Sequence, residues 1–508
     1  MNNRCNSQVL LLSPAIALAG LIGSPCLALA ETDEIHRSGS PSVVIPEVIS
    51  DPAIVKDELE ASDDRPLVPK PIPLAEFSTE ARDLAGAVPA IPAVVETHPA
   101  DDLAQTIAPP PATQPGLAER SRLTGDWGGV RSQWEAAGIT LDLEFTQYLQ
   151  KLAAGTGSEA VDYGGRLDGY LELDTEKLGW WDGGRLNAHL EYNFGDLPDS
   201  LGGTFFPTNS GMGFPSGSPN FLAATSLYLS QRLGSQGSLL IGKINALDLL
   251  DNDPFFGGLG TRRFQNAVFA APPSGLVPPV FFGAIANLRV DPVSFSLWVY
   301  DPEDRTQDYW PSGLFSSGVT FSLTTAYNTQ IAQRPTTFSI TGIYTTKTGI
   351  DFNSLSNSFQ QNSLRQGIDP STKQGSYSVA FQFSHLLHQL ESNPRQGWGI
   401  FVKGATSDGN PNYVQNSIIV GIGGYGLFAG RELDSFGVGY YYYDLSNDLQ
   451  DTLNVNRERI GDEQGLEVYY SYAVTPWFFL TGDVQYISPP RNALEDAFIL
   501  GLRANIRF

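Results

Sequence analysis

The sequence predicts an all-β fold, a transmembrane antiparallel β-barrel of about 16 strands, preceded by a short N-terminal helix and a long extension. Three observations predict it. Stretches of about 9–13 residues alternate apolar with polar side chains, and this length crosses a bilayer at a tilt. Short turns alternate with long loops between these stretches, as they do in outer-membrane barrels. An even number of strands returns both chain ends to one rim.

The composition supports this fold and excludes one class of partner. The 508 residues include 31 Lys and Arg against 55 Asp and Glu, a formal net charge of -24. A nucleic-acid partner would need a basic surface, so we expect none. Only 17% of residues are charged, whereas glycine (52) and tyrosine (20) are abundant. This mixture suits short strands, tight turns and aromatic girdles.

Residues 1–30 are predicted to be a secretory signal peptide. Arg4 precedes an apolar run, Val9–Ile22, and Ala28–Ala30 has the small-x-small pattern of a cleavage site. Prolines within the stretch disfavour the alternative of a membrane anchor. Both cysteines of the chain lie in this segment, so the mature protein is expected to have no disulfide and no thiolate metal site.

Residues 31–120 form a second region, which is rich in proline and alanine and acidic overall. Pro66–Pro73 and Pro109–Pro111 are examples, and no hydrophobic period is sustained. Such a stretch cannot bury enough apolar surface to offset the entropy of ordering. We interpret it as a disordered periplasmic extension that acts as a spacer. Binding to the cell wall is the alternative.

The barrel domain is expected to occupy residues 121–508 and to open with a short helix. Trp127 and Trp134 share one helical face, and Gly138 provides a stop. The first strand follows at once, with alternation from Ile139 onward. The sixteen predicted strands begin near residues 139, 163, 184, 221, 237, 280, 292, 318, 335, 374, 395, 415, 433, 464, 476 and 496. The predicted long connections are 195–220, 245–279, 301–317, 346–373 and 445–463.

The closing strand, Ala497–Phe508, gives the clearest alternation. Its even-numbered residues are all apolar and are assigned to lipid, whereas Arg503 and Arg507 are assigned to the water-filled side. Its final aromatic residue, Phe508, resembles the ending that the barrel assembly machinery reads. In a neighbouring strand, the run Tyr440–Tyr443 is interpreted as part of an interfacial girdle.

Charged side chains on the polar strand faces are the expected lining of the lumen. The acidic ones are Asp142, Glu144, Asp168, Glu172, Asp174 and Glu191. The basic ones are Arg166, Arg185, Lys243, Lys403, Arg503 and Arg507. Rows of opposite charge across a wet lumen would create a transverse field that favours polar solutes. The candidate pore-lining or solute-binding residues among them are Arg166, Asp168, Glu172, Arg185, Glu191, Lys243, Lys403 and Arg503.

The longest connection, residues 245–279, is the candidate constriction. It adds Asp251, Asp253, Arg262 and Arg263 to the candidate site residues and also carries several phenylalanines. Carboxylates and guanidinium groups can bond sugar hydroxyls, and aromatic rings can stack on the C–H face of a sugar. The loop is therefore expected to fold inward. The alternative is an outward surface loop.

The sequence offers little for catalysis. It has no G-x-S-x-G elbow, no Gly-rich phosphate loop and no H-E-x-x-H motif. His189 is expected to stand alone on a polar strand face, and His385 and His388 to bracket a short turn. We therefore expect no enzyme activity, no cofactor and no metal. An outer-membrane enzyme with a serine beside a histidine stays as a minor alternative.

Several of these segments together resemble the carbohydrate-selective porins of the OprB type. The matching segments are Leu123–Arg131, Gly138–Ile139, Gly165–Asp168, Trp181–Gly184, Leu240–Lys243 and the terminal Phe508. The resemblance covers residues 122–508 and implies a 16-stranded outer-membrane barrel with an arginine-bearing constriction that passes sugars. The acidic extension and the acidic share of the lumen depart from the pattern expected of that family.

The functional hypothesis is passive diffusion of carbohydrates and other small polar solutes across the outer membrane of a Gram-negative-type bacterium. The expected partners are outer-membrane lipid, small sugars or polar solutes and the assembly machinery. A general or cation-leaning diffusion porin is the main alternative. An enzyme, or a barrel that tethers the membrane to the cell wall through residues 31–120, is the remaining one.

Overall fold

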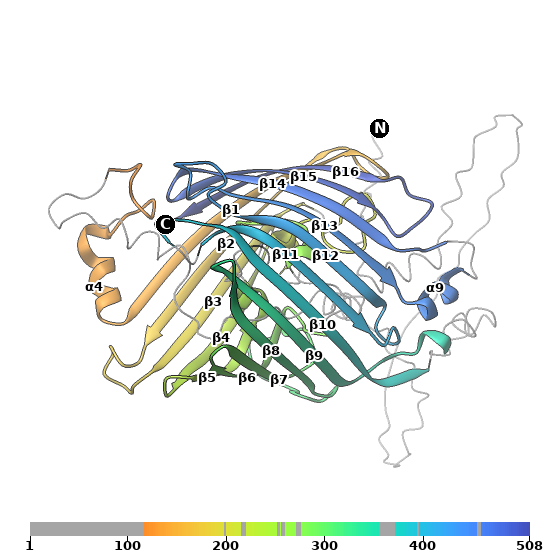
Figure 1. The fold of residues 1–508 in the computed structure, drawn as a ribbon, viewed down its shortest axis with the longest axis horizontal. Coiled ribbons are helices and arrows are strands. Elements are labelled where there is room, and N and C mark those ends of the chain that lie inside the picture. The colour runs from red at the N-terminus through yellow and green to blue at the C-terminus, as the bar shows by residue number, and fades with distance from the viewer. Residues whose placement is uncertain are drawn as a thin grey trace, which may run out of the picture.

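The protein folds into a closed antiparallel barrel of sixteen strands in which each strand pairs with its sequence neighbours and β1 pairs with β16 (Figure 1). This computed structural model describes residues 116–508 except 198–199, 215–219, 251–254, 256–259, 271–275, 355–370, 394–395 and 455–458. The predicted signal peptide and nearly all of the predicted extension therefore lie outside the described residues.

The strands are β1 (Ile139–Ala154), β2 (Val161–Asp174), β3 (Gly184–Gly195), β4 (Phe221–Leu233), β5 (Gly237–Asn245), β6 (Val280–Val290), β7 (Val293–Tyr300), β8 (Thr320–Ile331), β9 (Arg334–Ile350), β10 (Thr372–Gln389), β11 (Gly397–Ser407), β12 (Val414–Tyr425), β13 (Ser435–Leu445), β14 (Glu463–Thr475), β15 (Phe478–Ser488) and β16 (Ala497–Arg507). The helices are η2 (Trp127–Gly129), α4 (Val130–Ala136), α5 (Ser210–Gly213), α6 (Ala246–Leu250), α7 (Ala267–Ala270) and α9 (Asn447–Asn454). No helix in the described part of the chain is both long and apolar enough to cross a membrane.

The predicted strand number is confirmed, and every predicted start lies within two residues of the observed one. The predicted lengths are wrong at the extremes. β7 has 8 residues, whereas β9 has 17 and β10 has 18. Both ends of the predicted loop 346–373 therefore belong to strands. Threonine-rich segments such as Thr345–Thr348 continue the ladder because paired backbone groups need no apolar side chains.

The strands have an outward face that is mainly apolar, and most polar side chains of the strands point inward. In β8 the outward Phe321 and Leu323 are 43% and 50% exposed, whereas the inward Ser322 and Thr324 are 1% and 2% exposed. A sheet with an exposed apolar outer face and no open edge is the structure that lipid requires, because every backbone group in the spanning part is paired. The alternation predicted from the sequence is thus the wall of a membrane barrel.

The segment before β1 ties several strand ends together; we call residues 116–138 the strap. Both terminal nitrogens of Arg131, in α4, donate to the carbonyl oxygen of Phe508 at 3.0 Å, and the Leu123 N–H donates to the Arg507 carbonyl at 2.8 Å. The strap turns into β1 at Gly138, where φ is +92° and a side-chain carbon would lie 2.9 Å from the Asp174 carbonyl oxygen. Only glycine fits that turn.

The tyrosine run does not form a girdle as a whole. Tyr440 lies on the outer face and is 38% exposed, but Tyr441 and Tyr443 point inward and are 1% and 0% exposed. Strand alternation sends neighbouring residues to opposite faces, so the girdle prediction is wrong for these two. They stack on each other with ring centroids 6.1 Å apart and belong to the interior.

Candidate functional site

Two long connections turn into the barrel rather than away from it. The longer inner loop, residues 246–279, joins β5 to β6 and carries α6 and α7. The shorter inner loop, residues 196–220, joins β3 to β4 and carries α5. The longer loop bonds to β14, which lies seven places from β5 around the closed strand order, so it crosses the interior.

The far end of the longer inner loop is held by two buried ionisable side chains, Glu467 and Arg503. The Glu467 carboxylate accepts the backbone N–H groups of Gln265 at 2.5 Å and Asn266 at 2.9 Å. Arg503 donates from one terminal nitrogen to the carbonyl oxygens of Gly260 at 2.7 Å and Arg263 at 2.8 Å. An acceptor for N–H groups and a donor for carbonyls thus satisfy an irregular backbone that has no strand partner.

Aromatic packing fixes the same part of the loop. Phe264 and Phe269 stack with centroids 4.3 Å apart against the inner face of β13. A side-chain carbon built on Gly437 would lie 2.6 Å from Phe264, and one on Gly439 would collide with Phe269. Because these two glycines have no side chain, the two phenylalanine rings can pack directly against the backbone of β13.

The two inner loops also bond to each other and to the wall. The Ala267 N–H donates to the Pro207 carbonyl at 2.9 Å, and the Ser210 N–H donates to the Gln265 carbonyl at 2.6 Å. In addition, the Glu463 carboxylate of β14 accepts the N–H of Phe205 at 2.6 Å. The loops therefore form one layer within the barrel.

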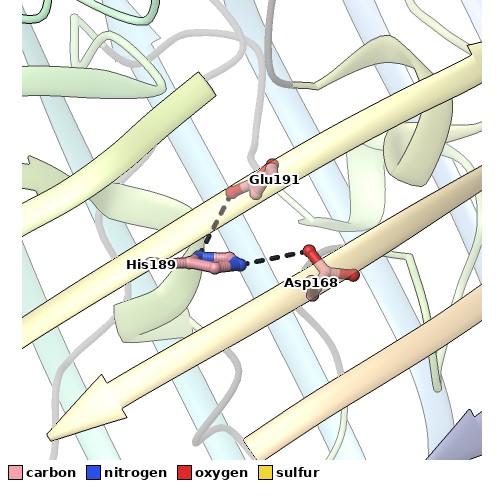
Figure 2. A group of neighbouring side chains, drawn as sticks. All are labelled: Asp168, His189 and Glu191. Carbon is pink, nitrogen blue, oxygen red and sulfur yellow. Dashed lines mark hydrogen bonds and ion pairs between the residues drawn. The ribbon is translucent and has the colours of Figure 1, made fainter. Parts of the chain in front are cut away.

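A second anchor lies on β2 and β3, where opposite charges gather in one buried cluster. Figure 2 shows three of its members, Asp168, His189 and Glu191. Arg166 lies 2.6 Å from Asp168 and 2.8 Å from Glu191, and His189 lies between these two carboxylates. Asp248, from α6 of the longer inner loop, lies 2.9 Å from the Nδ1 of His189. Arg166 also donates to the Gly211 and Phe214 carbonyls of the shorter inner loop. The cluster thus holds both loops.

His189 does not stand alone, so that prediction is wrong. Its Nε2 lies 3.1 Å from Asp168, and its Nδ1 is shared by Asp248 and Glu191. Both ring nitrogens face carboxylates, so His189 is not poised to take a proton from a nucleophile. The three residues drawn in Figure 2 have donor atoms close enough for a metal ion, but the guanidinium of Arg166 already supplies the positive charge there.

The other histidine pair also differs from its prediction. His385 and His388 do not bracket a turn, because both lie in β10, which ends at Gln389. The Nδ1 of His385 lies 2.8 Å from the Thr336 hydroxyl of β9, and His388 stacks near Trp398 at 5.9 Å. β10 continues past the position at which a turn was predicted, because its residues still favour the extended conformation and pair with the neighbouring strands.

The structure brings together only some of the residues that the sequence singled out. Arg166, Asp168 and Glu191 share one cluster, and Arg503 binds the loop that carries Arg262 and Arg263. Arg262 forms an ion pair with Glu144, and Lys243 donates to the carbonyls of Thr306 and Asp308. Glu172 and Arg185 form a separate, partly exposed pair, and Lys403 lies apart on β11. Asp251 and Asp253 lie outside the described residues.

Sequence reasoning missed Glu463, Glu467 and the inward path of the shorter loop. The signal was present for Glu467, which alternates with Leu466 and Val468 in a predicted strand, whereas Glu463 was assigned to the preceding connection, 445–463. A single carboxylate on a polar strand face, however, looks the same whether it meets water or a loop backbone. Only the partner N–H groups distinguish the two cases.

The closed sixteen-stranded wall with an apolar exterior, together with a layer of loops held inside it, defines an outer-membrane porin. The family model for the carbohydrate-selective porins, OprB family, matches residues 158–508, which is more than half of the chain, and the chain belongs to this family. The protein is located in the outer membrane of a Gram-negative bacterium, where porins of this family admit carbohydrates. Its partners there are membrane lipid and small sugar solutes.

Two solved structures are similar to this chain, and the first of them supports the fold. The high-pH structure of Pseudomonas putida OprB is similar to this chain with a TM-score of 0.66 and 17% identity, covering 78% of this chain and 100% of that one. The low-pH structure of the same protein gives a TM-score of 0.48 and 16% identity, covering 77% and 99%. A comparison with curated proteins finds no match.

Proposed function

We propose that the two inner loops form the constriction at which this porin selects its solutes, and that neutral sugars and other small polar solutes pass by passive diffusion. The observation that carries the proposal is the double anchoring of the longer inner loop. It is bonded to the β2–β3 cluster through Asp248 and to β14 and β16 through Gln265 and Gly260. A loop whose backbone is held at both sides of a lumen narrows that lumen.

The charge arrangement supports selection without a strong preference for ions. The sequence suggested rows of opposite charge facing each other across the lumen. Instead, Arg166, Asp168 and Glu191 lie within ion-pair distance on adjacent strands. Opposite charges at such short range largely cancel at a distance, so the transverse field is weaker than opposed rows would give. A weak field adds little to the free energy that a neutral solute needs to displace ordered water and pass.

We assign the buried charged residues a positioning role. Arg166, Asp168, Glu191, Arg262 and Arg503 hold the inner loops or pair with the wall. Glu172 and Arg185 keep 29% and 35% of their side chains exposed and are the better candidates for contact with passing solutes.

A cation-leaning general porin is the second candidate. The cluster of β2, β3 and α6 contains three carboxylates, from Asp168, Glu191 and Asp248, against the side chains of Arg166 and His189. An excess of carboxylate near the pathway would favour cations. Neither candidate involves a covalent step, and we propose a channel without enzyme activity.

Reconstitution tests the two candidates. Swelling of liposomes in glucose or maltose, together with a concentration-dependent decrease of single-channel current by these sugars, is the expected result. Impermeable proteoliposomes and a current unchanged by sugar would contradict sugar passage. A reversal potential close to the cation limit in a salt gradient, with no sugar effect, would support the second candidate.

The remaining parts of the chain receive proposals from sequence alone. We propose that residues 1–30 direct export and are removed, that residues 31–120 act as an acidic spacer, with cell-wall binding as the alternative, and that Phe508 contributes to recognition by the assembly machinery. N-terminal sequencing of the mature protein tests the first. Co-sedimentation with peptidoglycan, with and without residues 31–120, tests the second. Assembly of a Phe508→Ala variant tests the third.

A further inference from the structure

The inner face of β2–β6 opens to water beside the anchor of the longer inner loop. At the anchor, His189 and Ser226 both bond Asp248 and are only 1% and 2% exposed. Closer to the rim that carries the short turns and the strap, which we call the short-turn rim, Asn187 is partly exposed and the side chain of Arg185 is 35% exposed. The lumen is therefore accessible to a solute on this side of the loop layer.

Six partly exposed polar residues line this accessible region; we call them the exit patch. Each lies within three residues of the strand end at the short-turn rim, which faces the periplasm in outer-membrane barrels. All six have the parity of the buried inward residues of their strands, such as Asp168 on β2 and Ile285 on β6. They form three directly opposed pairs on neighbouring strands: Glu172 with Asn187, Arg185 with Ser230, and Ser238 with Asn287.

Two asparagine–serine hydrogen bonds organise the exit patch. The Nδ2 of Asn187 donates to the Ser230 hydroxyl oxygen at 3.3 Å, and the Nδ2 of Asn287 donates to the Ser238 hydroxyl oxygen at 3.2 Å. In both bonds the serine accepts, and no described residue accepts the proton of either hydroxyl. Each serine can therefore donate to a solute, and the Oδ1 of Asn187 can accept from one.

The two serines are spaced so that one small solute can reach both. Ser230 lies opposite Leu240, and Ser238 lies two residues before Leu240 on the same face of β5. Diagonal neighbours of this kind are about 7–8 Å apart. A single sugar ring with its hydroxyl groups can bridge the two positions.

The charges of the exit patch cancel within it. Glu172 and Arg185 are its charged members, and they approach to 3.7 Å. The patch thus has no formal net charge, although it offers several donors and acceptors. A solute hydroxyl, which both donates and accepts, matches such a surface. A simple ion gains little from it, because each charge on the wall has an opposite charge beside it.

We propose that the exit patch binds a neutral polyhydroxylated solute, of the sugar class, as it leaves the inner loops for the periplasm. The inference rests on the proposed sugar passage and deepens it by naming where the sugar contacts the wall. Ser230 and Ser238 donate to sugar oxygens, and the Asn187 Oδ1 and the Glu172 carboxylate accept from sugar hydroxyls.

The test is sugar block of single-channel current in planar bilayers with the full-length protein. The double variant Asn187→Leu/Asn287→Leu is similar in volume but has no amide, so the half-blocking concentration of maltose should rise roughly fivefold or more. Asn187→Gln/Asn287→Gln keeps both amides and should stay closer to the wild type. Asn328→Leu is the matched control, because Asn328 also pairs with a hydroxyl, that of Thr337, but lies on β8 outside the patch.

The outcomes separate the patch from sugar passage as such. If maltose blocks the wild type and the double leucine variant equally, the exit patch does not bind the sugar, although sugar passage stands. A rise in Asn328→Leu as large as in the double variant would also contradict the patch. If maltose and glucose block neither protein and neither enters liposomes, sugar passage itself fails and the patch fails with it. Resistance of the folded barrel to detergent at room temperature shows that each variant has assembled.

Discussion

The inner faces of two parts of the barrel wall differ in charge. On β1–β3 and β14–β16, which we call the anchor wall, several inward residues are ionisable, and they bond the backbone or side chains of the inner loops. On β7–β10, from the row of Thr320 to the row of Ala326, which we call the hydroxyl wall, the inward residues are uncharged, and serine and threonine predominate. The difference teaches that the ionisable groups inside this barrel mainly hold the inner loops.

Removing the acceptor at the anchor wall should have the largest effect. Glu467→Ala leaves the N–H groups of Gln265 and Asn266 buried without an acceptor, at about 1–3 kcal/mol each. The longer inner loop should detach, and single-channel conductance should rise with greater current noise. Glu467→Gln retains one carbonyl acceptor and should fall in between. Wild-type conductance in the alanine variant would show that this loop is not the constriction.

Filling a gap in the anchor wall should have the next largest effect. Gly439→Val places methyl groups where the ring of Phe269 lies, and overpacking of this kind costs about 1–3 kcal/mol. The ring and its loop should move into the lumen and change both the conductance and the maltose block. Val438→Leu, one residue away on the outer face, is the control and should leave both unchanged. Equal behaviour of the two variants would argue against the packing described here.

Adding a charge to the hydroxyl wall should lower stability. Ser322→Asp places a carboxylate at a position that is 1% exposed and has no charged neighbour on this wall, so the variant should unfold at a lower temperature than the wild type. Ser322→Asn is similar in size and neutral, and it should lower the unfolding temperature less. An unfolding temperature of Ser322→Asp equal to that of the wild type would show that water reaches this position.

The smallest effect is expected at the partly exposed pair of the anchor wall. Arg185 and Glu172 approach to 3.7 Å, with 35% and 29% of their side chains exposed. Such a pair contributes about 1 kcal/mol or less, so Arg185→Ala should lower the unfolding temperature only slightly, as followed by heat-modified migration in gels. A large loss of stability would mean that Arg185 has further partners within the wall.

The sequence was sufficient for the wall because alternation is a local property. The even-numbered residues of Ala497–Phe508 face lipid as predicted, and Arg503 faces inward. It was insufficient for the interior because the partners there are distant in sequence. Glu467 and Gln265 are about 200 positions apart, and nothing local to either residue signals that contact.

The same limit explains the errors at Tyr441 and His189. Tyrosine at a strand end is common in girdles, but here the inner loops provide an apolar surface that Tyr441 joins. His189 seemed isolated because Asp168 and Asp248 come from another strand and from a loop helix. The hydroxyl wall escaped notice since serine and threonine carry no charge signal, although their even spacing in β8 was readable.

The strap has a kinetic consequence. Arg131 and Phe508 are 377 residues apart, so their contact cannot form until β1 and β16 have both been made and have met. Contacts of such long range form slowly, and until then the barrel presents two unpaired edges that can pair wrongly. Once the barrel has closed, the bonds from the strap to Arg507 and Phe508 must break before β1 and β16 can separate at this end. The segment ahead of the first strand therefore slows reopening more than it speeds closure.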